Sequence, residues 1–371
     1  MALPEITKNV VIVGGGLAGL TSALLLNRAG FAVTLIEKKP YPFHRVCGEY
    51  ISNEVLPFLK SLDIDIEALG ASKITRLAIS SSSGDIFGSG LDLGGFGLSR
   101  YVLDDFLHQK AKSEGVQFII GNKVNAINYL GDNFEITLSD NSTLYSPIVI
   151  AAYGKRSNLD KERKFFKNRS PYMGVKYHIK TDFPDDLVQL DNFDGGYCGT
   201  VKIEGDKYNL CYLSKNLNLK KYGSIEEMER QVLFKNPILK QRFLNADFLN
   251  EKPEVINEIS FEQKPVVENR ILYCGDAAGM ISPLCGNGMA MAMHSAKVLS
   301  EIIIDHYSDR ETVEIVYRIS WKNLFENRLI TGRLTQRLFG HNMLSKYVVK
   351  GLKSIPGLSQ YMIRKTHGNP F

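Results

Sequence analysis

The stretch Asn9-Val-Val-Ile-Val-Gly-Gly-Gly-Leu-Ala-Gly19 runs from apolar residues into a glycine-rich turn and then into small side chains. Residues 9–13 predict a buried parallel strand, and the small and apolar residues 17–29 predict a helix that Gly30 ends. A second apolar run at 32–37 predicts the next strand. Together these elements predict a βαβ unit of about 30 residues, the building block of a parallel α/β sheet.

The glycines of this turn have the spacing of a pyrophosphate site. Gly14, Gly16 and Gly19 follow the GxGxxG pattern, in which glycine permits a tight turn and lets backbone amides at a helix N-terminus meet a pyrophosphate. Glu37 ends the second predicted strand, where an acid binds the ribose hydroxyls of an adenosine. Strand, turn, helix and acid in register predict a bound dinucleotide, against the alternative of an ordinary glycine-rich turn.

A second segment, Tyr273-Cys-Gly-Asp-Ala-Ala-Gly-Met-Ile-Ser-Pro-Leu-Cys-Gly-Asn-Gly-Met289, indicates which dinucleotide binds. Residues 271–275 predict a strand that delivers Asp276 to a loop, where its carboxylate can bind a ribityl chain. The amides of residues 286–289 begin a long predicted helix and can face the isoalloxazine edge on which negative charge collects upon reduction. The alternative is a Gly/Asn cap on a core helix. Because the two segments suit different parts of FAD, we expect FAD as the cofactor.

Composition predicts a soluble, cytoplasmic protein with a large core. The chain has 371 residues, of which 44% are hydrophobic, enough for two domains that share one cofactor. The apolar stretch near its start is too short for a signal peptide or a spanning helix, and no later apolar run reaches the required length. The five cysteines are scattered, odd in number and without a CxxC pair. We therefore expect reduced thiols and no metal site.

The rest of the chain alternates between strand and helix patterns. Residues 74–97 predict an antiparallel hairpin, and residues 170–263 predict a mostly antiparallel sheet with a helix near 224–234. Residues 287–371 are helical by pattern. The remaining expected elements are a helix over 98–115, strands over 117–120, 124–129, 134–138 and 148–152, and helix breaks at Gly332, Gly340 and 354–357.

We predict an α/β fold in which a discontinuous, Rossmann-type FAD-binding domain carries an inserted substrate domain, mostly antiparallel β, and a C-terminal helical segment. The expected ranges are 1–73, 99–165 and 264–308 for the FAD-binding domain, 74–98 and 166–263 for the substrate domain, and 309–371 for the helical segment.

Several motifs occur in the order seen in one superfamily. They are Gly14–Gly19, Glu37, Arg45-Val-Cys-Gly-Glu49, Ser99-Arg100, Ala152-Tyr-Gly-Lys-Arg-Ser157 and Gly275–Met289. Over about residues 8–305 the chain resembles FAD-dependent oxidoreductases of the para-hydroxybenzoate hydroxylase-like superfamily, closest to its geranylgeranyl reductase branch. The branch assignment rests mainly on Cys47-Gly48-Glu49 and on the loop at 283–289.

The resemblance implies roles for several residues. Arg45 and Arg100 contact the FAD phosphates or ribityl chain, for which guanidinium groups are suited because they form bidentate, charge-assisted bonds. The alternative for each arginine is a surface ion pair. The implied cofactor-binding residues are Gly14, Gly16, Gly19, Glu37, Lys38, Arg45, Cys47, Gly48, Arg100, Val124 (beside the adenine), Asp276, Gly286, Asn287, Gly288 and Met289.

Three departures from the superfamily limit what the resemblance implies about the reaction. Tyr153 stands where the hydroxylases usually carry an Asp that serves both FAD and the nicotinamide cofactor, which argues against direct use of NAD(P)H. Residues 196–201 lack the Tyr-x-Trp-x-Phe-type stretch of the reductase branch. The Trp-x-Trp motif of related halogenases is absent, since Trp321 is the single tryptophan, so we do not expect halogenation.

Cys47 and Cys285 would both approach the flavin if the resemblance holds. They are candidate catalytic residues, as a redox dithiol or as a proton donor to a substrate carbon. The alternative, which we favour, is that both are small buried apolar residues, because free cysteine is among the most buried residue types.

Residues 322–371 are strongly basic. They hold nine Lys or Arg against the single acid Glu326, whereas the whole chain has a net charge of only +5. Amphipathic helices of this kind usually pack on their own domain. The alternative is peripheral contact with an anionic membrane. Nucleic-acid binding is not expected because no reading motif accompanies the local charge, and the sequence indicates no oligomeric state.

The function expected from these features is an FAD-dependent oxidoreductase that acts on a largely apolar small molecule. Reduction or dehydrogenation of a carbon–carbon bond ranks first. A monooxygenase that uses NAD(P)H and oxygen is the alternative, and a flavin-binding protein without turnover is a third reading. The sequence shows no second nucleotide domain, so NAD(P)H would visit the flavin transiently or be replaced by another electron donor.

Overall fold

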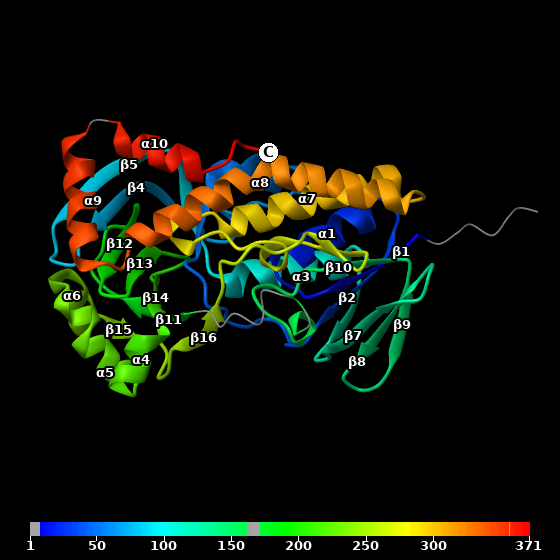
Figure 1. The fold of residues 1–371 in the computed structure, drawn as a ribbon, viewed down its shortest axis with the longest axis horizontal. Helices are drawn as coiled ribbons and strands as arrows, with labels where there is room; N and C mark the ends of the chain where they lie inside the picture. Colours follow the sequence, from blue (N-terminus) through cyan, green and yellow to red (C-terminus); the bar gives the residue numbers. More distant parts are fainter. Residues whose placement is uncertain (1–7, 162, 164–170, 356) are drawn as a thin grey trace, which may run out of the picture.

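The computed structural model describes residues 8–161, 163, 171–355 and 357–371. A six-stranded sheet with the order β17-β18-β10-β1-β2-β6 occupies one half of the molecule (Figure 1). Neighbouring strands from β18 to β6 are parallel, and β17 pairs antiparallel at the edge. The bounds are β1 Asn9–Val13, β2 Ala32–Glu37, β6 Gln117–Ile120, β10 Ile148–Ala151, β17 Val267–Glu268 and β18 Ile271–Tyr273.

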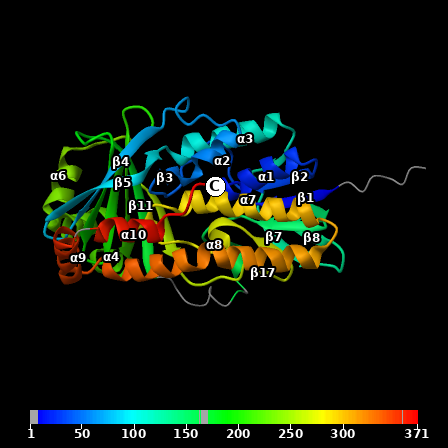
Figure 2. The ribbon, with the colours of Figure 1, turned by 90° about the horizontal axis from the view of Figure 1, so that it is seen from above.

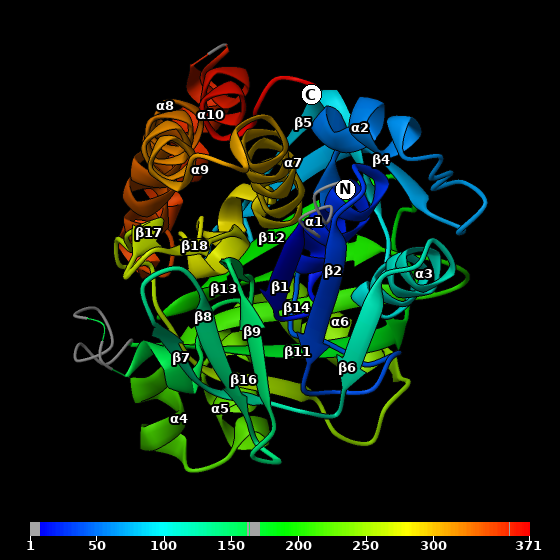
Figure 3. The ribbon, with the colours of Figure 1, turned by 90° about the vertical axis from the view of Figure 1, so that its right-hand side faces the viewer.

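Helices α1 (Leu17–Arg28), α3 (Arg100–Ser113) and α7 (Gly288–His306) belong to the same half, and α1 contacts both of the others (Figure 3). Residues 10–13 of β1 and all of β10 are buried and apolar, as is usual for strands of a parallel sheet that is covered on both faces. The short α2 (Leu56–Ser61) follows β3 (Tyr50–Ser52) in the chain. The antiparallel strands β7 (Val124–Tyr129), β8 (Phe134–Leu138) and β9 (Thr143–Ser146) form a separate sheet.

A nine-stranded sheet forms the other half, in the order β15-β11-β14-β13-β12-β4-β5-β3, with β16 also paired to β11. Its described pairs are antiparallel except for β4 with β12, which are parallel with Ile79 opposite Leu190. The mostly antiparallel sheet was therefore predicted correctly. The bounds are β3 Tyr50–Ser52, β4 Ser72–Ser80, β5 Ile86–Gly97, β11 Tyr172–Lys180, β12 Leu187–Phe193, β13 Gly196–Lys202, β14 Tyr208–Lys215, β15 Asp247–Phe248 and β16 Glu254–Ile259.

Three short helices lie at the outer end of this sheet: α4 (Asn216–Tyr222), α5 (Ile225–Gln231) and α6 (Pro237–Asn245) (Figure 1). They close a second core in which Met228 and Phe243 pack with β11 to β14. The sequence predicted one helix near 224–234 and missed α4 and α6.

The C-terminal helices are α8 (Arg310–Leu338), α9 (Asn342–Ser354) and α10 (Leu358–Thr366), and α8 runs alongside α7 (Figures 1 and 2). The predicted break at Gly332 is wrong, because α8 continues through it. A Cβ at Gly332 would lie 3.1 Å from Ile281 Cγ1 and 3.4 Å from Cys285 Sγ, so this glycine serves a close approach of α8 to the loop before α7.

The predicted α/β fold is confirmed. The break at Gly340 occurs as expected, and α9 and α10 are separated at 355–357, of which Pro356 lies outside the described residues. The domain ranges stay a prediction. Their boundary at 165/166 lies outside the described residues, and β3, within the expected range 1–73, joins the nine-stranded sheet. In the part of the chain that the structure describes, we find no helix with the length and apolarity needed to cross a bilayer.

Candidate functional site

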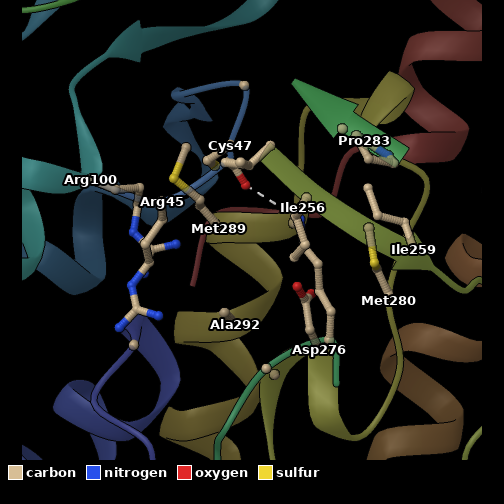
Figure 4. Close-up of a pocket in the computed structure, with 18 of the residues that line it drawn as sticks. Arg45, Cys47, Arg100, Ile256, Ile259, Asp276, Met280, Pro283, Met289 and Ala292 are labelled. Carbon is tan, nitrogen blue, oxygen red and sulfur yellow. Dashed lines mark hydrogen bonds between the residues drawn. The ribbon is translucent and has the colours of Figure 1, made fainter. Parts of the chain in front are cut away.

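A cavity of about 790 Å³ extends from the glycine turn after β1 to the nine-stranded sheet. Its walls come from segments far apart in the chain: the β1–α1 turn, residues 43–50, residues 152–159, the loop from β18 to α7, and strands of the large sheet. In Figure 4, Arg45 and Arg100 lie on one side of this cavity and Ile259 and Met280 on the other.

The glycine turn admits no side chain at two of its predicted positions. Gly14 has a φ of +107°, and a Cβ there would lie 2.5 Å from Tyr153 Cα. At Gly19, which does not line the cavity, a Cβ would lie 1.9 Å from the Gly14 carbonyl oxygen. Gly16 precedes α1 and provides no side-chain cap, so the first amides of the helix face the cavity without a side-chain acceptor. The turn therefore has the open, amide-lined form that a pyrophosphate requires.

Glu37 is buried at the end of β2, as predicted, and is held beside this turn. Its Oε2 accepts hydrogen bonds from the Gly15 amide (2.9 Å) and from Arg45 Nη2 (3.3 Å). Its Oε1 accepts from the Lys39 amide (3.1 Å). Lys38 and Val124, both predicted to bind the cofactor, also line the cavity.

Arg45 and Arg100 line the cavity together and share one carboxylate, Asp104. Arg45 Nε lies 2.9 Å from Asp104 Oδ2, and Arg100 donates to both carboxylate oxygens, at 2.6 and 2.7 Å. Burial by itself lowers the pKa of Arg100, but Asp104 raises it above its usual value, so the guanidinium stays charged. Sequence reasoning missed Asp104, although it follows Arg100 by one helical turn in a predicted helix.

Asp276 lines the cavity on the loop that follows β18 (Figure 4). The Nζ of Lys264 donates to the carbonyl oxygens of Asp276 (2.9 Å) and Lys155 (3.0 Å), and so ties this loop to the segment after β10. Burial lowers the pKa of Lys264 to about 8. Nothing in the local sequence marks this lysine.

The predicted start of the long helix is present, since α7 begins at Gly288 with Asn287 as its N-cap. Gly286 has a φ of +67°, and a Cβ there would lie 2.8 Å from Tyr50 Cδ1, so the position requires glycine. Gly286, Gly288 and Met289 line the cavity, whereas Asn287 is buried beside it. The N-terminus of α7 therefore points its partial positive charge toward the cavity.

Cys47, Gly48 and Cys285 line the cavity as well. The Cys47 carbonyl oxygen accepts a hydrogen bond from Asn209 Nδ2 (3.1 Å). Burial raises the pKa of the Cys285 thiol to about 12, so it is protonated at neutral pH. Catalytic roles for the two thiols stay a prediction.

A buried charged cluster beneath Cys47 and Gly48 was not predicted. Glu49 is 0% exposed, and its carboxylate lies 2.6 Å from Lys176 Nζ and 2.7 Å from His178 Nε2. The amide of Arg100 donates to the same carboxylate at 3.0 Å. Burial alone raises the pKa of Glu49, but Lys176 and His178 outweigh it and hold the pKa below its usual value. Glu49 is therefore ionised, and it joins three elements at the cavity wall.

Tyr153 lines the cavity at the position where the hydroxylases usually carry an Asp, and its side chain is held in place by a hydrogen bond of its own. Its hydroxyl donates to Asp160 Oδ1 at 2.7 Å, and its ring meets Tyr273 edge to face. Asp160 is buried, and its Oδ1 also accepts a hydrogen bond from Arg163 Nη1 at 3.1 Å.

The end of the cavity that reaches the large sheet is mostly apolar, although Tyr197 and Thr200 of β13 also line it. The apolar side chains come from β4, β5, β12 and β13, from the residue that follows α8, and from α10. These residues are Leu77, Ile79, Leu91, Val188, Leu190, Val201, Phe339, Met362 and Ile363.

Comparison with known proteins gives one family and a set of distant relatives. The model of a family described as "FAD binding domain" matches residues 7–316. A tryptophan 2-halogenase of Chondromyces crocatus is 23% identical, over 80% of this chain, which spans only 60% of that protein's length. A digeranylgeranylglycerophospholipid reductase of Methanococcus vannielii is also 23% identical, over 86% of this chain and 83% of the relative.

Among solved structures, the flavin-dependent brominase Bmp2 superposes with a TM-score of 0.79 at 20% identity, covering 96% of this chain and 92% of the other. A likeness at this identity shows the fold alone. The cavity residues and the matched family agree on the cofactor, because the glycine turn, the paired arginines and the start of α7 fit the parts of FAD.

Proposed function

Since the chain belongs to the FAD-binding-domain family and is an enzyme of the FAD-dependent oxidoreductase type, we propose that it reduces or dehydrogenates a carbon–carbon bond of a largely apolar small molecule. FAD, when bound, supplies the transfer of a hydride or of electrons. The chain's own residues bind the cofactor, orient the substrate and exclude water.

Cofactor binding is divided between the two segments of the site. The glycine turn and the start of α1 would hold the pyrophosphate, with Arg45 and Arg100 supplying charge beside it. Glu37 would bind the ribose hydroxyls, Val124 would lie beside the adenine, and Asp276 would bind the ribityl chain. The partial positive charge at the start of α7 would stabilise the reduced isoalloxazine.

The observation that carries the proposed substrate class is the apolar end of the cavity. Aliphatic side chains such as Ile79, Leu190 and Val201 line it, and an apolar ligand gains roughly 25 cal/mol for each Å² that it removes from water there. A strongly polar substrate would lose most of its hydration there, with few side chains such as Tyr197, Thr200 and Thr335 to replace the lost hydrogen bonds.

Two features favour reduction or dehydrogenation over monooxygenation. Tyr153 replaces the acid that serves the nicotinamide cofactor in hydroxylases, and its hydroxyl is engaged by Asp160. The Cys47-Gly48-Glu49 element of the reductase branch lies at the cavity wall, fixed by Asn209 and the Glu49 cluster. The chain resembles proteins with reductase, monooxygenase and halogenase names, so fold alone does not select the reaction.

Halogenation is the least favoured of these reactions. Trp321 is the single tryptophan of the sequence, and it packs in the core between Tyr317 and Phe325 of α8. It does not line the cavity, so no indole ring is available there to take the part of the halogenase motif.

The test is anaerobic reoxidation of the reduced FAD-loaded enzyme. We expect unsaturated isoprenoid lipids to restore the oxidised flavin spectrum without oxygen, and tandem mass spectrometry to place two added hydrogens on the carbons of a former double bond. Reoxidation that requires oxygen, with NAD(P)H and oxygen consumed in step with product, would establish the monooxygenase instead. A flavin that no donor reduces would favour the non-catalytic reading.

The same assay tests the two thiols. A thiol that acts as general acid contributes about a hundredfold or more in rate, so turnover of Cys47→Ala and Cys285→Ala variants within a few-fold of the parent would exclude that role. We expect this result for Cys285, whose buried thiol is a weak acid.

A further inference from the structure

Large apolar side chains are exposed on the C-terminal helices. On α9, Met343 is 74% and Tyr347 is 69% exposed, and on α10 Tyr361 is 62% exposed. Single exposed apolar residues are common on protein surfaces and need no explanation. Here they occur on two adjoining helices that lie at one corner of the molecule with the end of α8 (Figures 1 and 3).

Basic side chains accompany these apolar groups. Met343, Tyr347 and Lys350 follow one another at spacings of four and three residues, so they share one face of α9. Lys346 and Lys353 are exposed beside that face. On α10, Lys365 is one turn from Tyr361 and its Nζ lies 5.6 Å from the Tyr361 ring centroid. We call the exposed faces of α9 and α10 the C-terminal surface.

A groove next to this surface leads toward the main cavity. It has a volume of about 380 Å³ and lies between α8 and α10, with Ile330 and Tyr361 among its walls. Thr335 and Met362 line both this groove and the main cavity. The groove therefore meets the apolar end of the cavity across two side chains.

We propose that the C-terminal surface docks on an anionic lipid bilayer and that the groove admits the apolar substrate from it. The docking step is inferred from the residues of the C-terminal surface alone, whereas the substrate-entry step also rests on the proposed function. Lysines beside tyrosine and methionine on one helical face are typical of helices that lie in the membrane interface. The cores of protein–protein interfaces are depleted in lysine, which argues against a second protein as the occupant.

The first experiment measures co-sedimentation of the full FAD-loaded chain with vesicles. We expect binding to equimolar phosphatidylcholine and phosphatidylglycerol, little binding to phosphatidylcholine alone, and weakening by salt. Each lysine near an anionic surface strengthens binding about fivefold. The variant Lys346→Gln/Lys350→Gln/Lys353→Gln should therefore bind about a hundredfold more weakly.

A matched control removes the same charge elsewhere. Lys112 is exposed on α3, and Lys220 and Lys221 are exposed on α4; both helices lie away from α9 and α10 in Figures 1 and 3. Lys112→Gln/Lys220→Gln/Lys221→Gln should bind the mixed vesicles as the parent does. Equal loss in the two triple variants, or no vesicle binding by the parent, would overturn the proposal.

A second variant reports contact directly. Tyr347→Trp places an indole at a 69% exposed position, and brominated acyl lipids should quench its fluorescence, whereas Trp321, which is 6% exposed, should be quenched little. Met343→Asp/Tyr347→Asp should lose vesicle binding while keeping its flavin spectrum. A different outcome would contradict the proposal: the parent does not bind vesicles, and the aspartate variant has a different oligomeric mass from the parent in analytical ultracentrifugation. The C-terminal surface would then be an interface between copies of the chain.

Docking and turnover can fail separately. Loss of vesicle binding with intact anaerobic turnover of detergent-dispersed substrate would remove only the present inference. Intact vesicle binding by an enzyme that turns over none of the apolar substrates would instead remove the proposed function.

Discussion

Glu49 shows how one residue organises the cavity wall. Its backbone has a φ of +54°, a conformation that a residue with a side chain rarely adopts, and its carboxylate bonds two side chains of β11 and the first amide of α3. The loop that carries Cys47 and Gly48 is thereby fixed between the large sheet and the FAD-binding half of the molecule.

Replacing Glu49 with glutamine should destabilise the protein by about 3–5 kcal/mol, because Lys176 would remain as a buried cation without its counter-charge. Urea unfolding of the FAD-free protein measures this change. FAD should also bind more weakly, since the loop that lines its pocket loses its anchor.

The double variant Glu49→Gln/Lys176→Met provides the control. With both charges of the pair removed, much of the lost stability should return, because no buried cation is left without its counter-charge. An unchanged urea midpoint for Glu49→Gln would show that the cluster carries no net stability.

At the scale of residues, sequence reasoning identified what is local. Gly14, Gly16 and Glu37 could be placed because one βαβ unit fixes their relative positions. Lys176 and His178 could not be placed, since they meet Glu49 across 127 and 129 residues of chain and the register between the two halves is invisible in the sequence.

Among the elements, α5 carries a second unpredicted group. The carboxylate of Glu229 is buried against β11 and β14, and its Oε1 accepts hydrogen bonds from the hydroxyls of Tyr177 (2.9 Å) and Tyr212 (2.8 Å). Burial raises the pKa of Glu229 to about 7 from a usual 4.5. The short helix thus holds a carboxyl group that stays partly protonated at neutral pH.

The pH dependence of stability follows from that shift. The pKa of Glu229 is higher in the folded than in the unfolded protein, so the folded state binds the proton more tightly. Protonated Glu229 therefore contributes its full share to the free energy of unfolding below pH 4.5, and this share is lost as the pH rises through 7. In Glu229→Gln the side chain keeps its size but does not titrate. Between pH 4.5 and 7 the free energy of unfolding of this variant should therefore fall by roughly 2–3 kcal/mol less than that of the parent.

Thermal or urea unfolding at acidic and mildly alkaline pH measures the difference between parent and variant. Parallel profiles for the two proteins would contradict the assignment. Glu227→Gln on the same helix is a suitable control, because the Glu227 carboxylate lies at the surface, where it accepts a hydrogen bond from Gln231 Nε2 at 2.8 Å.

The strands and long helices were largely predictable, because a buried parallel strand and an amphipathic helix each leave a periodic pattern. Gly332 was misjudged for a physical reason. Glycine in a helix can mark either an end or a close contact, and only the packing of α8 against the loop at 281–285 distinguishes the two.

For the molecule as a whole, the C-terminal residues return to the FAD-binding half. Glu54 is buried and pairs with Arg328 of α8 at 2.8 Å, and it also accepts a hydrogen bond from the Gly368 amide. The Phe371 amide donates to the Glu54 carbonyl oxygen at 3.1 Å, and its ring stacks on His294 of α7. One acid thus ties the last helices to the core.

Glu54→Gln should destabilise the protein by about 3–5 kcal/mol, since it removes a buried carboxylate that faces a charged guanidinium. It should also speed tryptic cleavage within 340–371, where docking to the core limits access. Glu301→Gln, which removes an exposed pair with Lys297, should change stability by about 0.5 kcal/mol or less.

The overall architecture was predictable because two motifs that are far apart in the sequence suit two parts of the same cofactor. Residues 276–289 must therefore lie close to the glycine turn at 14–19. The position of the C-terminal helices was not, because nothing in their pattern indicates whether the apolar face meets the protein or a bilayer.

The split of the flavin site between residues 14–19 and 276–289 has a consequence for synthesis. The ribosome makes the glycine turn early, yet the strand β18, which completes the parallel sheet beside β10, and the start of α7 follow about 260 residues later. Until they emerge, β10 presents an unpaired edge and no complete pocket exists to capture FAD. FAD can therefore bind only when synthesis of the chain is nearly complete, so flavin incorporation is a late step in maturation.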